Sequence, residues 1–188
     1  MNCADCKSKD CYEGKDCFNG RGDPRPHLDE QDLHMLRTAA QIESEYYLKA
    51  TRLEEIIEFA KRMEYQTLGV AFCVGLADEA KVIVEILGKH FTVHSVCCKA
   101  GGLNKQELGL SQIHSDRRES TCNPVGQARL LADAGTQLNL IVGLCIGHDI
   151  LFTKHSAAPV TTFVVKDRVL AHNPLGAITS GYHRKNRF

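Results

Sequence analysis

Four cysteines stand close together at the start of the chain, in a segment with very few apolar residues. They are Cys3, Cys6, Cys11 and Cys17, spaced C-x2-C-x4-C-x5-C. The residues between them are mainly Lys, Asp, Glu, Ser and Gly, so the segment cannot bury enough apolar surface to offset its backbone entropy. Thiolates ligate zinc and iron, and metal binding can supply free energy that a core does not. We therefore expect a metal centre here rather than a flexible tail with chance cysteines.

The spacing leaves two cofactors open for this quartet. Zinc ribbons use two separated C-x2-C pairs, and this segment has one. Its spacing is nearer to a zinc knuckle, although knuckles have a histidine where this chain has Cys11. An all-cysteine loop is equally natural around a [4Fe–4S] cluster. We expect either structural zinc or an iron–sulfur cluster, with zinc slightly favoured.

The other five cysteines follow apolar, strand-like runs or precede a helix. They are Cys73, Cys97, Cys98, Cys122 and Cys145. Buried cysteines commonly pack as small hydrophobic residues, which is the plain alternative to a site. Their placement argues for more, because the carboxyl ends of parallel strands meet at one edge of a sheet. Adjacent residues on a strand point to opposite faces, so we expect one of Cys97 and Cys98 to join the cluster, and favour Cys98. The predicted second centre is an iron–sulfur cluster or zinc held by Cys73, Cys98, Cys122 and Cys145, with Cys97 as an additional candidate.

Strands and helices alternate along most of the chain, and this pattern predicts how the second cluster is positioned. The predicted strands cover 67–73, 91–98, 138–145 and part of 160–174, where a hairpin about Lys166 and Asp167 is an option. Two helices, or one kinked helix, are predicted over 29–64, with a capping box at Thr51 and Glu54. Further helices are expected with Asp78 as a cap and Gly88 as a stop, over 122–135 with Asn123 as a cap, and from near Asp149. The pattern predicts an α/β fold with a mostly parallel sheet and helices on both faces. A cysteine-rich module over 1–27 precedes this domain, which spans 28–188.

Polar residues near the predicted sheet edge suggest a ligand for the second centre. His148 lies three residues after Cys145 and could be a further metal ligand or a proton donor, although loop histidines more often only pack their rings. Lysines and histidines follow in the last third of the chain, and they could bind a small anionic molecule: Lys154, His155, Lys166 and His172. Solvated surface charge is the alternative interpretation for the lysines.

Composition narrows the class of protein. Lys and Arg number 23 and Asp and Glu number 23, which argues against a generally basic nucleic-acid or membrane surface. No apolar run approaches the length of a membrane span, and no secretory signal is apparent. Nine cysteines in such a chain favour metal ligation or thiol chemistry over disulfides. We expect a cytoplasmic protein; the composition says nothing about its oligomeric state.

Several of these motifs resemble those of a known family. The stretches AFCVGL, SVCCKAGG, CNPVGQA, GLCIGHDILF and APVTTFVVKDRVLAHNP are similar to a cysteine-rich family of anaerobic bacteria and archaea that is classed as a domain of unknown function. The resemblance extends over essentially the whole chain. It places all nine cysteines, His148, Lys166, Asp167 and His172 in family motifs and implies metal binding in an oxygen-poor cytoplasm. It implies no reaction.

Three functions follow from these observations. The first is a metalloprotein with two cysteine-ligated centres, acting as a redox or sulfur-handling enzyme on a small anionic ligand. The second is a knuckle-like module that binds single-stranded RNA, against which the neutral net charge counts. The third is a trafficking protein whose metal or sulfur exchanges instead of taking part in catalysis.

Overall fold

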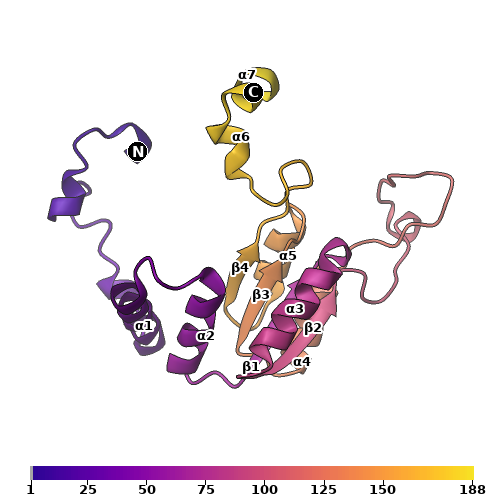
Figure 1. Cartoon of the computed structure of the whole chain (residues 1–188), viewed down its shortest axis with the longest axis horizontal. Coiled ribbons are helices and arrows are strands. Elements are labelled where there is room, and N and C mark those ends of the chain that lie inside the picture. Colours follow the sequence, from indigo (N-terminus) through magenta and orange to yellow (C-terminus); the bar gives the residue numbers. More distant parts are fainter. Residues whose placement is uncertain (1) are drawn as a thin grey trace.

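The computed structural model describes residues 2–188, and its centre is a four-stranded parallel sheet (Figure 1). The strands are β1 (Thr67–Phe72), β2 (Thr92–Cys97), β3 (Leu138–Val142) and β4 (Val160–Val164), in the order β2-β1-β3-β4. Every neighbouring pair is parallel. The predicted α/β class and parallel sheet are therefore confirmed.

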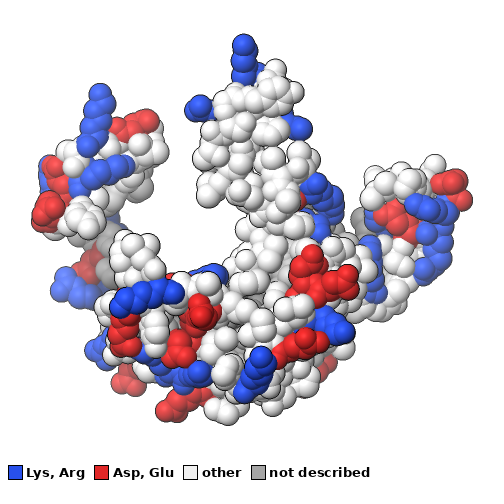
Figure 2. All heavy atoms as spheres, viewed as in Figure 1, with Lys and Arg blue, Asp and Glu red and all other residues white. Residues whose placement is uncertain are grey.

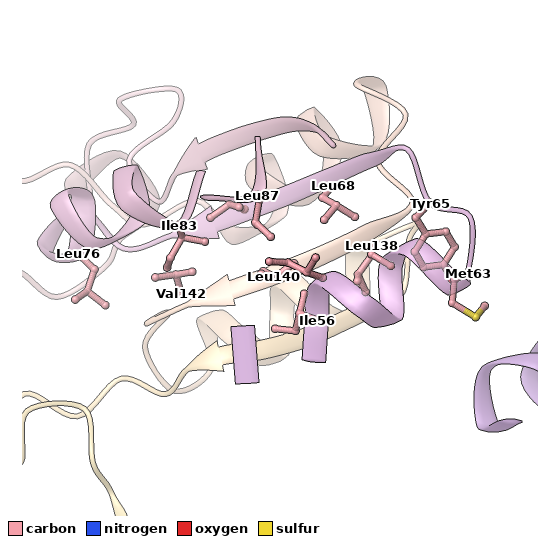
Figure 3. Close-up of a cluster of buried hydrophobic side chains, with 13 residues drawn as sticks. Ile56, Met63, Tyr65, Leu68, Leu76, Ile83, Leu87, Leu138, Leu140 and Val142 are labelled. Atoms are coloured by element: carbon pink, nitrogen blue, oxygen red, sulfur yellow. The ribbon is translucent and has the colours of Figure 1, made fainter. Parts of the chain in front are cut away.

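Helices cover both faces of the sheet, because the central strands are apolar on both faces. Leu68 of β1 and Leu140 of β3 pack against α2 (Arg52–Arg62) and α3 (Ala77–Leu87). Figure 3 shows this core, in which Ile56 of α2 and Ile83 of α3 lie against the sheet. Ala71 and Ile141 point to the opposite face and pack against α4 (Pro124–Asp133) and α5 (His148–His155). Parallel strands buried in this way give the continuous apolar runs that the sequence shows.

The region predicted as two helices or one kinked helix forms two. Helix α1 (Glu30–Tyr46) begins at Asp29, whose carboxylate accepts a hydrogen bond from the Asp32 N–H. Helix α2 begins at Thr51, and the predicted capping box with Glu54 is present. Both helices therefore start where the sequence supplies a side chain for their free N–H groups.

Two further predictions of helix starts have different outcomes. Asn123 caps α4 by accepting a hydrogen bond from the Gly126 N–H, as predicted. Asp78 does not cap α3, so that prediction was wrong. The short 3-10 helix η4 (Val74–Leu76) runs directly into α3 and places Asp78 in the first turn instead. A negative side chain there still interacts favourably with the helix dipole.

The predicted hairpin about Lys166 and Asp167 is also wrong. Strand β4 ends at Val164, and the Asp167 carboxylate accepts hydrogen bonds from the N–H groups of Val169 and Leu170. This turn redirects the chain away from the sheet, so no returning strand can pair. Two short helices, α6 (Leu175–Thr179) and α7 (Gly181–Arg187), follow it.

Three segments project from the body of the protein (Figure 1). They are the N-terminal segment, the loop between β2 and α4, and the C-terminal pair α6 and α7. Acidic and basic side chains are interspersed over much of the face in Figure 2, whereas the charged side chains of the C-terminal pair are basic. No helix within residues 2–188 has both the length and the hydrophobicity needed to cross a bilayer.

A close contact between the two central strands makes a glycine necessary at position 69. A Cβ at Gly69 would overlap the Asn139 side chain, which donates a hydrogen bond to Ser156 Oγ at 2.8 Å. We expect Gly69→Ala to lower the free energy of unfolding by about 2–4 kcal/mol, through overpacking and loss of this bond. Urea unfolding followed by circular dichroism measures the change. Gly181→Ala is the control, because nothing lies within 4 Å of its added Cβ. Equal stability of the two variants would contradict the packing seen around Asn139.

Candidate metal centre

The carboxyl edge of the sheet contains the point where the chain connections change direction. Adjacent strands β1 and β3 lead to helices on opposite faces, since α3 packs in one core and α5 in the other. Loops on either side of such a switch point diverge, which leaves room for a ligand. Cys73 follows β1 and Cys145 follows β3, so both lie at this point. The Cys73 N–H donates to the Val142 carbonyl at 3.0 Å and ties the two strand ends together.

Hydrogen bonds from one asparagine bring Cys98 and Cys122 together. The Asn123 N–H donates to the Cys98 carbonyl at 2.8 Å, and Asn123 Nδ2 donates to the Ala100 carbonyl at 3.1 Å. These bonds fasten the start of α4 to the end of β2, although 23 residues separate Ala100 from Asn123. The two sulfurs are close enough for hydrogen bonding between them to shift the pKa of each thiol. The Val74 N–H, from the loop after β1, donates to Cys98 Sγ at 3.3 Å.

The two thiols of this pair have opposite acidities. Hydrogen bonding with Cys98, together with the positive charge of Lys99, lowers the pKa of Cys122 to about 5 against the opposing cost of burial. Lys99 Nζ lies 3.5 Å from Cys122 Sγ and also donates to the Ser120 carbonyl at 2.6 Å. The same hydrogen bond, with burial, raises the pKa of Cys98, which is 2% exposed. The pair therefore carries one thiolate, on the half-buried Cys122, and one protonated thiol.

An arginine from the turn after β4 contacts the fourth cysteine of this edge, Cys145. Arg168 Nη2 lies 2.9 Å from Cys145 Sγ, and this contact raises the pKa of the guanidinium above its ordinary value. The Arg168 charge also acts on Cys73 and Cys122, so it is shared among three sulfurs. Cysteines from four separate segments thus gather at one edge of the sheet, among cationic side chains that favour thiolates.

Lys166 lies over the switch point itself. Its Cδ would be 3.7 Å from a Cβ at Gly143, just past β3, and its Nζ would be 3.8 Å from a Cβ at Gly75, in the loop after β1. The lysine therefore extends from one side of the switch point to the other. Gly143 has a φ of +66° and lies against Leu76, so only glycine suits this approach.

The N-terminal quartet lies apart from this edge (Figure 1). None of residues 2–30 is buried, and all four of its cysteines are exposed. They line one hollow of about 690 Å³, together with Lys9 and Asp16 among others. Backbone N–H groups of Lys9 and Ser8 and the Ser8 hydroxyl lower the pKa of Cys6. The segment has the donor set of a metal site without a packed core of its own.

Within residues 2–188, the other predicted site residues form no hydrogen bond with the four clustered sulfurs. Cys97 ends β2 and is half-buried, and the hydrogen bonds and charge interactions that link the other four sulfurs do not include it. Lys154 and His155 are exposed in the last turn of α5. That turn lies near the amino end of β3, because Ser156 contacts Asn139. His172 Nδ1 accepts a hydrogen bond from the Asp167 N–H and so stabilises the turn that carries Lys166 and Arg168.

Within residues 2–188, no three side chains of Cys, His, Asp or Glu are positioned to hold a metal ion as they stand. At the sheet edge, two sulfurs are engaged with each other and Cys145 is engaged with Arg168. Metal binding would need these contacts to exchange for metal–sulfur bonds and the sulfurs to draw together. The donor set fits zinc or an iron–sulfur cluster, both of which bind thiolates and accept N–H hydrogen bonds at sulfur.

Sequence reasoning did not single out Lys99 and Arg168 as site residues. Lys99 directly follows Cys98, and its position beside two cysteines was an available signal. Arg168 lies in a stretch with several charged residues, and no spacing rule distinguishes it from Lys154. Only the turn capped by Asp167 brings it to Cys145.

The fold and the site define a doubly wound α/β protein with a cysteine-rich carboxyl edge. This chain belongs to the family described as Protein of unknown function (DUF1847), whose model matches residues 24–163. That range contains the five cysteines of the sheet domain and leaves the N-terminal quartet outside. An uncharacterized protein of Methanocaldococcus jannaschii is 52% identical over 187 residues, which cover 98% of this chain and 97% of that protein. No solved structure matches this chain. The predicted membership of an uncharacterised family is confirmed.

Proposed function

We propose that this chain is a cytoplasmic metalloprotein with two cysteine-ligated centres. Cys3, Cys6, Cys11 and Cys17 hold zinc or an iron–sulfur cluster, and Cys73, Cys98, Cys122 and Cys145 hold an iron–sulfur cluster or zinc. The main support is the gathering of the second set from four distant segments at the ligand-binding edge of a parallel sheet. Inert core cysteines need no such common location and no cationic neighbours.

The cations near the second set also favour chemistry over a purely structural role. Thiolate-bound iron carries electrons, and its reduction potential depends on nearby charge and hydrogen bonds. Here Lys99 and Arg168 supply positive charge, and the Val74 N–H donates to a ligand sulfur. The function that fits best is a redox or sulfur-handling enzyme, with His148 at the start of α5 as a further ligand or proton donor.

Elemental analysis tests this proposal directly. We expect protein purified without oxygen to contain metal at both centres, with iron and acid-labile sulfide if a cluster is present and zinc without sulfide otherwise. Visible absorbance that is lost in air identifies the cluster. Protein without stoichiometric metal at either centre would refute the proposal.

The exposure of the first quartet favours a second candidate for that segment, which is transfer of metal to or from a partner. All four of its sulfurs are exposed around an open hollow. Exposed thiolates exchange metal readily, whereas buried ones do not. In this case a chelator would remove the N-terminal metal within minutes and leave the circular dichroism of the sheet domain unchanged. Metal that is released only when the domain unfolds would exclude transfer.

A further inference from the structure

The cationic side chains at the switch point have no carboxylate partners. Within the described chain, residues 2–188, none of Lys99, Lys166 and Arg168 forms a salt bridge. Two acidic residues of this edge are engaged with backbone groups: Asp149 accepts from the Ile150 N–H, and Asp167 from the N–H groups in its turn. The positive charge at this edge therefore faces the cysteines and solvent.

The positive charge at this edge exceeds the negative charge that a loaded metal centre would carry. Four thiolates carry a charge of −4, and Zn²⁺ or an oxidised [4Fe–4S] core carries +2. The net charge of the loaded centre is therefore about −2 in either case. Lys99 already contacts Cys122, and Arg168 contacts Cys145. Within residues 2–188, no hydrogen bond joins Lys166 to a sulfur, and its ammonium would lie 3.8 Å from a Cβ at Gly75. One positive charge thus remains at the place where doubly wound proteins bind ligands.

We propose that this edge binds a small carboxylate beside the metal centre, with Lys166 and Arg168 as the residues that hold its carboxylate group. The inference rests on the metalloprotein function proposed above. A singly charged group matches the one remaining positive charge better than a phosphate dianion does. Arg168 is exposed and contacts Cys145 through Nη2. A guanidinium offers five N–H donors, so the remaining ones can pair with two carboxylate oxygens.

The approach of Lys166 to both sides of the switch point explains why it is suited to this role. Its stem packs near Gly143 and its charge lies near Gly75, so the lysine is half-buried at the switch point. The turn between β4 and α6 carries both cations, and His172 fixes its geometry. Because the turn is already ordered, binding a carboxylate through its side chains does not require the backbone to be ordered first.

Thermal unfolding of the anaerobically purified protein tests the inference. Acetate and, separately, inorganic phosphate replace chloride at constant ionic strength, and the dependence of the unfolding temperature on anion concentration gives each dissociation constant. We expect acetate to bind more tightly than phosphate. Lys166→Gln and Arg168→Gln are each expected to weaken acetate binding about tenfold or more, because each loses a charge-assisted hydrogen bond. Arg168→Lys keeps the positive charge but loses the paired N–H donors of the guanidinium. Its affinity for acetate is expected to lie between the affinities of these two variants and that of the wild type.

Lys89→Gln is the matched control, since it removes one lysine charge at an exposed position after α3. It should bind acetate like the wild type. Full metal content with no acetate binding, or equal effects of all the substitutions, would overturn this inference and leave the metal centre standing. Tighter binding of phosphate would overturn the carboxylate assignment. Protein without metal would overturn both proposals, because the charge count depends on the loaded centre.

Discussion

Cys122→Ser is expected to lose the metal of the sheet edge and to keep the metal of the N-terminal quartet. Cys122 is the thiolate of the Cys98–Cys122 pair, and its pKa of about 5 makes it the sulfur best prepared to bind a cation at neutral pH. A serine hydroxyl stays protonated and is a poor ligand for zinc or iron. Cys11→Ser should have the converse effect, because the quartet lies apart from the sheet (Figure 1). Metal and sulfide analysis of the two variants and of the double variant measures each centre separately.

Cys97→Ser provides the control for this experiment. Cys97 ends β2 beside Cys98 and lies outside the network that links the other four sulfurs. It should retain the wild-type metal content, and circular dichroism should show that all the variants are folded. If Cys97→Ser loses the sheet-edge metal and Cys122→Ser keeps it, the assigned ligand set is wrong.

The sheet could be predicted because its strands are buried on both faces. Apolar runs at 67–73 and 138–145 have no polar alternation, which is the pattern of central parallel strands, and they became β1 and β3. Caps at Thr51 and Asn123 fixed two helix starts through side-chain hydrogen bonds that are local in sequence. Once the strands were parallel, the placement of Cys73 and Cys145 at the same edge of the sheet followed from the topology.

The positions of the remaining site residues could not be predicted from the sequence, because they depend on the geometry of a turn and on the length of a helix. The Asp167 turn, and not a hairpin, decides that Arg168 reaches Cys145. Lys154 and His155 follow Cys145 closely in sequence, yet α5 carries them about 10 Å from its first turn, towards the other edge of the sheet. Nearness in sequence to a site residue therefore says little when a helix lies between. The cations that do reach the sulfurs come from the residue next to Cys98 and from the turn after β4.

Cys122 of the metal-free protein is expected to react with iodoacetamide at a rate that changes little between pH 6 and pH 8. The thiolate is the reacting form, and a pKa of about 5 means that about 90% of it is already formed at pH 6. An ordinary cysteine, with a pKa near 8.5, would gain roughly a hundredfold in rate over the same range. For Cys122 the rate should fall only as the pH drops through about 5 and protonates the sulfur. Mass spectrometry of peptides alkylated at each pH, after anaerobic metal removal, gives the profile.

Two variants separate the causes of this lowered pKa. Cys98→Ala removes the hydrogen bond that contributes most, so the midpoint of the Cys122 profile should move strongly towards that of an ordinary thiol. Lys99→Gln removes a smaller contribution, so its midpoint should move less in the same direction. The wild-type protein in concentrated urea serves as the reference, because unfolding separates the two sulfurs. A Cys122 profile that is the same in the folded and the urea-unfolded protein would show that the two sulfurs do not interact. The shared proton at the carboxyl edge would then be absent, while the Asn123 hydrogen bonds would still join the end of β2 to the start of α4.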